Sequence, residues 1–213
     1  MDLKLQGSAM TPHPPASFFI GSFPHHWRAE MLAARPLILP TRHFVYPAQA
    51  EEVERGALEV LVRPGALDSS TSSQEFLATC ALGFRDPAVP TGLWSCPNPE
   101  ELCAVSGGYA YIISTNNPER FAMISYRPVL NVLAAVVENL LLFVGHHSIL
   151  AWGADGQAWQ SEKLSSEGLT LEEVSGTVLH GLGWDLMTDR EVPFALDLKT
   201  GRRTSVASPP FSR

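Results

Sequence analysis

Short runs of apolar, β-branched and aromatic residues, each closed by a turn signal, recur along the chain from residue 58 onward. They span Leu58–Val62, Leu140–Val144, Ile149–Trp152, Thr177–Trp184 and Pro193–Leu198. Runs of this length and composition favour β-strands over helices. The chain is therefore predicted to be mainly β.

Two turn sequences support this prediction. Ala154-Asp155-Gly156 follows one run, and Asp-Gly readily takes the positive φ of a hairpin turn, so Gln157–Ser161 is expected to be the returning strand. Lys199-Thr200-Gly201-Arg202 closes the last run in the same way. Both patterns indicate antiparallel pairing.

Prolines dominate the N-terminal region. Seven of the 17 prolines fall in the first 50 residues. Proline lacks a backbone donor and fixes φ, which excludes a continuous helix or a central strand. Residues 1–49 are predicted to form an irregular, Pro-rich arm of loops and short edge strands within the same domain. Only Trp27–Ala34 has helical character.

A triplet that occurs twice suggests an internal duplication: Val105-Ser106-Gly107 and Val174-Ser175-Gly176. Two further pairs occur in the same order, namely Leu58–Val62 with Leu140–Val144 and Gly92–Trp94 with Gln157–Trp159. We therefore predict two repeats, 50–128 and 129–213, each an antiparallel sheet of about four strands. The sheets are expected to pack as propeller blades or as a sandwich.

The segment Phe194–Gly201 contains Ala-Leu-Asp-Leu-Lys-Thr-Gly. It resembles the outer hairpin of quinoprotein-type β-propeller blades, which carry Ala-Leu-Asp-x-x-Thr-Gly. The resemblance covers under a tenth of the chain and occurs once, whereas a propeller typically has 4–8 blades. It implies blade-like sheets without implying a quinone, and no cofactor is expected.

The formal net charge of −7 argues against a nucleic-acid or anionic-membrane surface. The N-terminus shows no secretory signal, and the longest apolar stretch, Val129–Val144, is too short to span a bilayer. Three cysteines, an odd number, fit reduced thiols. A cytoplasmic protein is therefore expected.

Histidines are the first candidates for chemistry. His146 and His147 lie between two predicted strands, and His180 could join them in a metal site. Adjacent residues on a strand point to opposite faces, so both imidazoles can bind one metal only from a turn. The alternative interpretation is a polar hairpin turn.

The string His180-Gly181-Leu182-Gly183-Trp184-Asp185 is the most distinctive. His180 and Asp185 are candidate catalytic residues, and Trp184 with Trp152 could form a ligand platform. Alternatively, the glycine face packs under a neighbouring sheet and the tryptophans belong to the core.

No nucleophile elbow, Walker loop, dinucleotide fingerprint or zinc-protease motif occurs in the sequence. We therefore expect a non-catalytic binding or assembly module. The alternatives are a small metal-assisted hydrolase and a small-molecule sensor. Exposed sheet edges also predict a homo-oligomer or a protein partner.

Overall fold

The computed structural model describes residues 18–48, 55–65 and 74–204, and every regular element assigned within these ranges is a β-strand. The predicted mainly β class with four-stranded antiparallel sheets is confirmed. The strands form four sheets, where the sequence suggested two. No helix in the described ranges is long and apolar enough to cross a bilayer.

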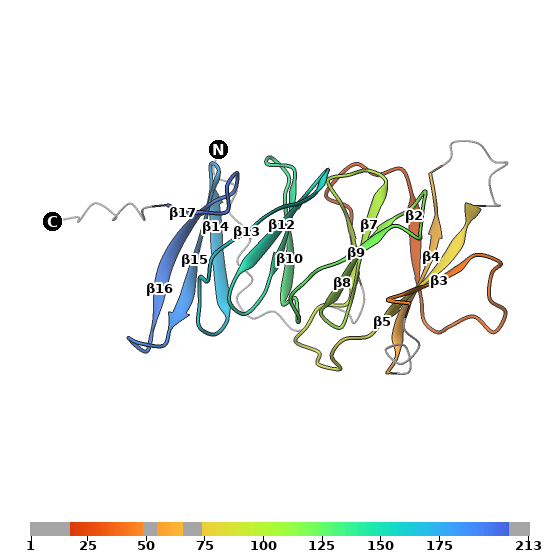
Figure 1. The fold of residues 1–213 in the computed structure, drawn as a ribbon, viewed down its shortest axis with the longest axis horizontal. Coiled ribbons are helices and arrows are strands. Elements are labelled where there is room, and N and C mark those ends of the chain that lie inside the picture. The colour runs from red at the N-terminus through yellow and green to blue at the C-terminus, as the bar shows by residue number, and fades with distance from the viewer. Residues whose placement is uncertain (1–17, 49–54, 66–73, 205–213) are drawn as a thin grey trace.

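We number the sheets along the row that they form in Figure 1, from orange to blue. The first sheet has the order β2-β4-β5-β3 and contains β2 (Arg28–Leu32), β3 (His43–Tyr46), β4 (Ala57–Arg63) and β5 (Phe76–Ala81). The second contains β1 (Phe18–Ile20), β6 (Gly92–Ser95), β7 (Glu101–Ser106), β8 (Tyr109–Ser114) and β9 (Phe121–Met123).

The third and fourth sheets are plain antiparallel meanders. The third contains β10 (Asn131–Ala135), β11 (Leu140–Val144), β12 (Ile149–Gly153) and β13 (Gly156–Gln160). The fourth contains β14 (Leu169–Ser175), β15 (Val178–Asp185), β16 (Arg190–Asp197) and β17 (Arg203–Thr204). The turns predicted at Asp155-Gly156 and Thr200-Gly201 lie where β12 meets β13 and where β16 meets β17.

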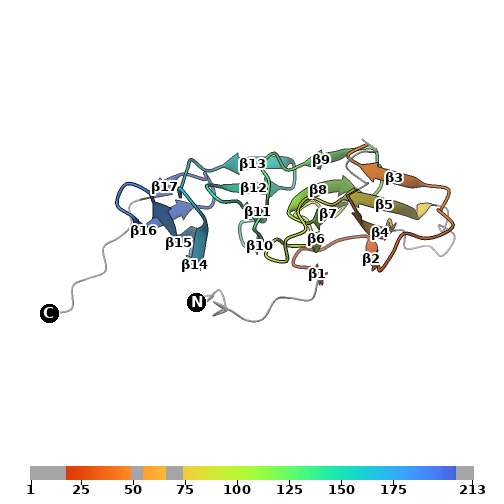
Figure 2. The ribbon, with the colours of Figure 1, turned by 90° about the horizontal axis from the view of Figure 1, so that it is seen from below.

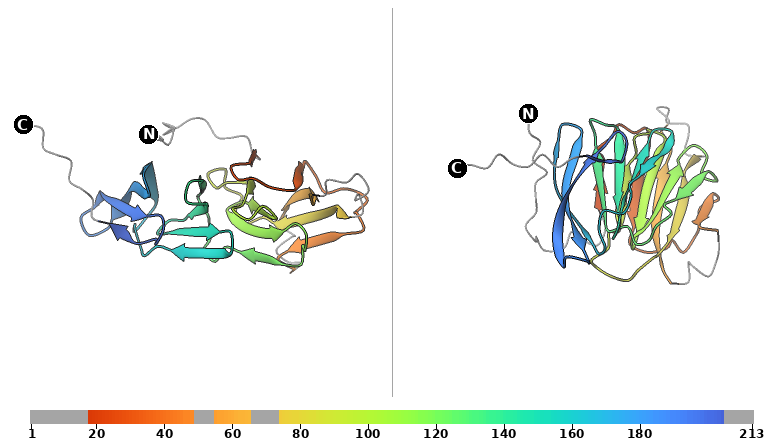
Figure 3. Two further views of the ribbon diagram at one scale, coloured as in Figure 1. Left: turned by 90° about the horizontal axis from the view of Figure 1, so that it is seen from above. Right: turned by 60° about the vertical axis from the view of Figure 1, so that its left-hand side comes forward.

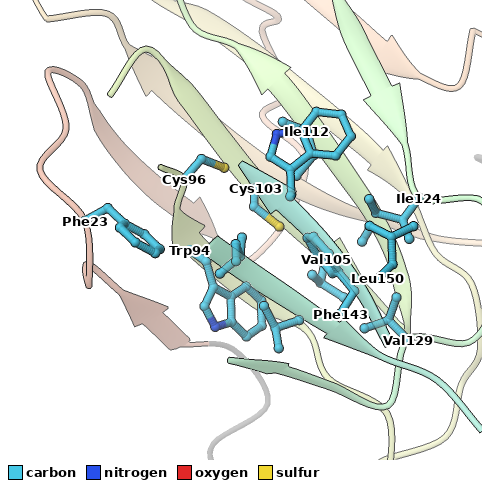
Figure 4. Packing of buried hydrophobic residues seen from close by; sticks show 14 residues of the cluster. Phe23, Trp94, Cys96, Cys103, Val105, Ile112, Ile124, Val129, Phe143 and Leu150 are labelled. Carbon is cyan, nitrogen blue, oxygen red and sulfur yellow. The ribbon is translucent and has the colours of Figure 1, made fainter. Parts of the chain in front are cut away.

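The sheets are layered face to face, as the right panel of Figure 3 shows. One apolar cluster fills each of the three interfaces between neighbours. Figure 4 shows the middle cluster, where Cys96, Cys103 and Ile112 of the second sheet region meet Phe143 and Leu150 of the third. The sheets therefore stack face to face in an open row.

The described part of the proline-rich region, residues 18–48, is built into this row. β1 pairs with β6 at one edge of the second sheet, and β2 and β3 form the two edges of the first. Edge positions are those predicted from the prolines. The helix suggested at Trp27–Ala34 is wrong, because Arg28–Leu32 pairs along its length with β4 and tertiary pairing overrides the local pattern.

The four-stranded meanders recur along the chain at a shorter spacing than the repeated triplet suggested. The first strands of the last three meanders begin at Gly92, Asn131 and Leu169, so a whole further meander lies between the two copies of the triplet. The segments matched in the sequence occupy different positions, since Gly92–Trp94 lies in β6 and Gln157–Trp159 lies in the last strand of the third sheet. The closer spacing of the meanders resembles that of four-stranded propeller blades, which repeat about every 40–45 residues.

Candidate functional site

The segment 161–168, called here the crossing segment, connects the third sheet to the fourth. The backbone carbonyl of His147 accepts hydrogen bonds from the amides of Leu164 and Ser165. The side chain of His147 adds a third bond, in which Nδ1 donates to the Ser165 carbonyl at 3.2 Å. On the other side, the amide of Ser166 donates to the Trp184 carbonyl at 2.7 Å. The crossing segment is therefore attached to both sheets.

Gly183 allows this close approach. A Cβ at this position would lie 2.3 Å from the carbonyl oxygen of Leu164, a distance that real Cβ atoms do not reach. The hydroxyl of Ser165 completes the junction, because it accepts from the amides of Trp184 at 2.8 Å and Glu167 at 3.1 Å. Gly183 thus packs under the crossing segment, whereas Gly181 on the same face lies against Thr170 and Phe194 of its own sheet.

A pocket of about 310 Å³ opens beside this junction. Its lining residues come from the crossing segment and from three strands of the fourth sheet: Lys163, Leu164, Ser165, Ser166, Gly183, Trp184, Asp185, Val192 and Arg203. The volume is at the lower end of the range for ligand sites. The pocket therefore suits a small ligand.

Two cations stand in this pocket, Lys163 and Arg203. The guanidinium of Arg203 donates to the carbonyls of Lys163 and Leu164, both at 3.2 Å, and this fixes its position at the rim. Its Nε also lies 3.1 Å from the carboxylate of Glu162. This ion pair is exposed, so it leaves the cation available to other anions at little cost.

Asp185 is the only acid among the lining residues, and its carboxylate is engaged. It accepts from the amide of Met187 at 3.0 Å and from the hydroxyl of Thr188 at 2.9 Å. These bonds hold the turn between β15 and β16. Asp185 therefore stabilises this turn, and its candidate catalytic role stays a prediction.

The other candidate residues do not gather at the pocket. Strand alternation puts His180 on the face of β15 opposite Gly183, away from the crossing segment. His146 and His147 are exposed, with ring centroids 6.0 Å apart. Among the described residues no group of three or more His, Cys, Asp or Glu could hold a metal ion, so the predicted metal set is not brought together.

The two tryptophans of the predicted platform lie in different places. Trp152 is buried between the second and third sheets, and its indole donates to the carboxylate of Glu101 at 2.9 Å. Trp184 lines the pocket of the fourth sheet. The pair therefore does not form one binding surface.

The three cysteines are free and fully buried. Burial raises the pKa of the thiols of Cys80, Cys96 and Cys103. A thiol in such surroundings is not a nucleophile. All three cysteines pack in the apolar clusters between the sheets.

A second polar cluster, which no pattern in the sequence indicates, lies on the outer face of the first sheet. The hydroxyl of Thr79 donates to the buried carboxylate of Glu59 at 2.6 Å, and His43 Nε2 lies 2.8 Å from the same hydroxyl. Arg35 reaches both His43 and Glu59 from the loop after β2. Thr79 is fully buried, so the cluster fixes a loop and exposes no nucleophile.

Lys163 and Arg203 are the functional candidates that the sequence did not reveal. They stand 40 residues apart and meet only because β17 returns along β16. Comparison with known proteins supplies no further candidate: no protein-family model matches the chain, and no curated protein matches it.

Proposed function

We propose that this protein is a non-catalytic binding module and that the pocket of the fourth sheet holds a small anionic ligand, carrying a carboxylate or phosphate group. The observation that carries the proposal is the pairing of Lys163 with Arg203 at one pocket whose single acid, Asp185, is already bonded in a turn. Two cations beside one carboxylate that is already hydrogen-bonded favour the binding of an anion.

The rigidity of the walls supports this function. Gly183 and Ser165 hold the crossing segment against β15, and Arg203 is fixed by two carbonyls. A site whose donors are already positioned loses less entropy when a ligand binds. The hydroxyl of Ser166 can supply a neutral donor beside the cations, whereas that of Ser165 is already bonded within the junction.

Catalysis has less support than binding. A metal-assisted hydrolase would need His146, His147, His180 and Asp185 to converge. His180 lies on the opposite face of its strand, and Asp185 is occupied. We therefore prefer a binding role. The free cysteines fit a reducing compartment such as the cytoplasm, and the net charge of −7 disfavours nucleic acid as the ligand.

The test is thermal denaturation of the full chain with inorganic phosphate and with citrate, at constant ionic strength. A ligand that binds only the native state adds about 2.7 kcal/mol of stability at a hundredfold excess over its dissociation constant. We expect one of these anions to raise the melting temperature. Lys163→Ala and Arg203→Gln should remove the effect.

The matched control is Lys199→Ala, which deletes an exposed lysine in the turn after β16, outside the lining residues. It should keep the response of the wild type. An equal response in all variants would indicate a general salt effect and refute the proposed site, as would no response to either anion.

A further inference from the structure

The row of sheets has two ends that differ in chemistry. The first sheet packs on the second through one face, and the fourth packs on the third through one face. The opposite faces of these two sheets lie at the two ends of the row, with no described strand beyond them (Figures 1 and 2). Each of these outer faces is a position at which a further sheet could stack.

The end formed by the first sheet carries an exposed apolar tip. The loop between β2 and β3 reaches past the sheet there and contains Pro36-Leu37-Ile38-Leu39-Pro40 (Figure 1). Leu37 is 105% exposed and Ile38 88%. Adjacent large apolar side chains exposed to this degree usually mark a contact surface.

This tip is held in a defined position. Arg35, just before it, contacts Glu59 and His43 of the sheet. After it, the carbonyl of Arg42 accepts from the amide of Leu77 at 3.0 Å, and the Arg42 side chain donates to the Gln74 carbonyl at 2.6 Å. The tip is anchored on both sides, so little ordering is needed for it to dock.

Arginine is the most frequent exposed charged residue among the described residues of this end. The strand register puts Arg28, Glu30 and Arg63 on the outer face, and Arg35 joins them from the loop. Glu59 is buried beneath Arg35. Among the described residues of this end, the exposed charged groups are three arginines and one glutamate, and Arg63 is already paired with Glu30 and with the partly exposed Glu75.

The outer face of the fourth sheet is complementary. Its side chains, placed by register on the three long strands, are Thr170, Glu173 and Ser175 on β14, Val178, His180, Leu182 and Trp184 on β15, and Glu191, Pro193, Ala195 and Asp197 on β16. Apolar groups form its centre. No lysine or arginine occurs among these positions, whereas three are acidic.

We propose that two copies of this chain associate head to tail, with the Leu37–Leu39 tip and the arginines of one copy docked on the outer face of the fourth sheet of the other. This contact continues the face-to-face stacking that already joins the four sheets. It is heterologous, since two different surfaces meet, and such contacts close into a ring or extend according to the rotation between copies. Two copies hold eight sheets, within the 4–8 blades of closed propellers.

The test uses two variants that each disable one surface. Leu37→Asp with Ile38→Asp alters the tip, and Glu173→Arg with Glu191→Arg alters the face; all four positions are exposed. We expect light scattering to show wild-type mass rising with concentration. Each variant alone should raise the dissociation constant at least about tenfold, as for residues central to an interface.

An equimolar mixture of the two variants decides the geometry, because each retains the surface that the other lacks. Head-to-tail association predicts that mixing restores a dimer of one copy of each. Val137→Asp, at an 82% exposed position in the turn after β10, is the control and should associate like the wild type. Circular dichroism and the melting temperature verify that every variant is folded.

Two results would overturn the proposal. One is a wild-type protein that stays monomeric at the highest concentration reached. The other is a dimer whose two variants fail to recover association when mixed, since this is the behaviour of an interface made of the same patch on both copies. Trp184 belongs to both surfaces, but neither result bears on the anion pocket, because its test measures an anion response that depends on Lys163 and Arg203, which lie outside the docking face.

Discussion

The indole N–H of Trp152 donates to the carboxylate of Glu101 at 2.9 Å, across the interface between the third and second sheets. The backbone carbonyl of the same glutamate accepts from the indole of Trp27 at 3.1 Å. Glu101 thus connects the N-terminal segment, the second sheet and the third sheet. Burial raises the pKa of its carboxyl, and the bond from Trp152 opposes this shift.

Removing this acceptor should destabilise the protein. Glu101→Ala leaves the Trp152 N–H without its partner, and an unsatisfied buried donor costs about 1–3 kcal/mol. Glu101→Gln keeps an acceptor oxygen and should cost less. Urea denaturation measures both. Equal losses for the two variants would show that the hydrogen bond contributes nothing measurable.

Gly201→Ala should destabilise the turn after β16 for two separable reasons. Its φ is +68°, which costs a residue with a Cβ about 1–2 kcal/mol. In addition, the new Cβ would lie 2.5 Å from the ring of Trp159. Gly176→Ala is the matched control, because its φ is +60° and nothing lies within 4 Å. The free energy of unfolding should fall further for Gly201→Ala, and equal losses would exclude the ring contact as a cause.

Stability should fall as pH is lowered below about 6.5, partly through His43. Burial, followed by the charge of Arg35, lowers the pKa of this imidazole from its ordinary value of 6.5. The unfolded chain therefore binds more protons between the two pKa values, and unfolding is favoured as pH drops through this window. His43→Gln should flatten the melting temperature against pH there. His146→Gln, at an exposed site, should leave the wild-type slope, and an unchanged slope in His43→Gln would contradict the assignment.

Gly183→Ala should displace the crossing segment, because the new methyl group would overlap the Leu164 carbonyl. We expect both a lower melting temperature and a loss of the anion response. Gly153→Ala in β12 is the control, since its nearest atom lies at an ordinary 3.7 Å. A Gly183→Ala protein with wild-type stability would show that the close approach is not required.

The sequence predicted those features of the fold that depend on residues adjacent to one another along the chain. Asp155-Gly156 and Thr200-Gly201 specify their turns through their own backbone preferences. β1, β2 and β3 lie at sheet edges, as expected for a proline-rich region, although the prolines themselves lie outside these strands. The number of sheets was missed because a repeated triplet does not define a structural period. Equivalent strands of successive sheets carry different residues, so the shorter spacing of the sheets is not visible as a repeated sequence pattern.

The candidate site was predicted only in part, for the same physical reason. Trp184 and Asp185 lie in a conspicuous local string, and both line the pocket. Lys163 and Arg203 lie in unremarkable stretches and become neighbours through strand pairing over 40 residues. Long-range pairing of this kind has no signature in a single sequence.

The open row of sheets also determines which sheets unfold first when the molecule opens partially. In linear arrays stability is roughly a sum over units and the interfaces between neighbours. The second and third sheets are held on both faces, whereas the fourth shares one interface. Amide protons of β15 and β16 should therefore exchange through partial opening before those of β7 and β11. The proposed anion pocket lies between the crossing segment and this outermost sheet, so a bound anion would hold the two together, slowing exchange at the end of the row and leaving the middle unchanged.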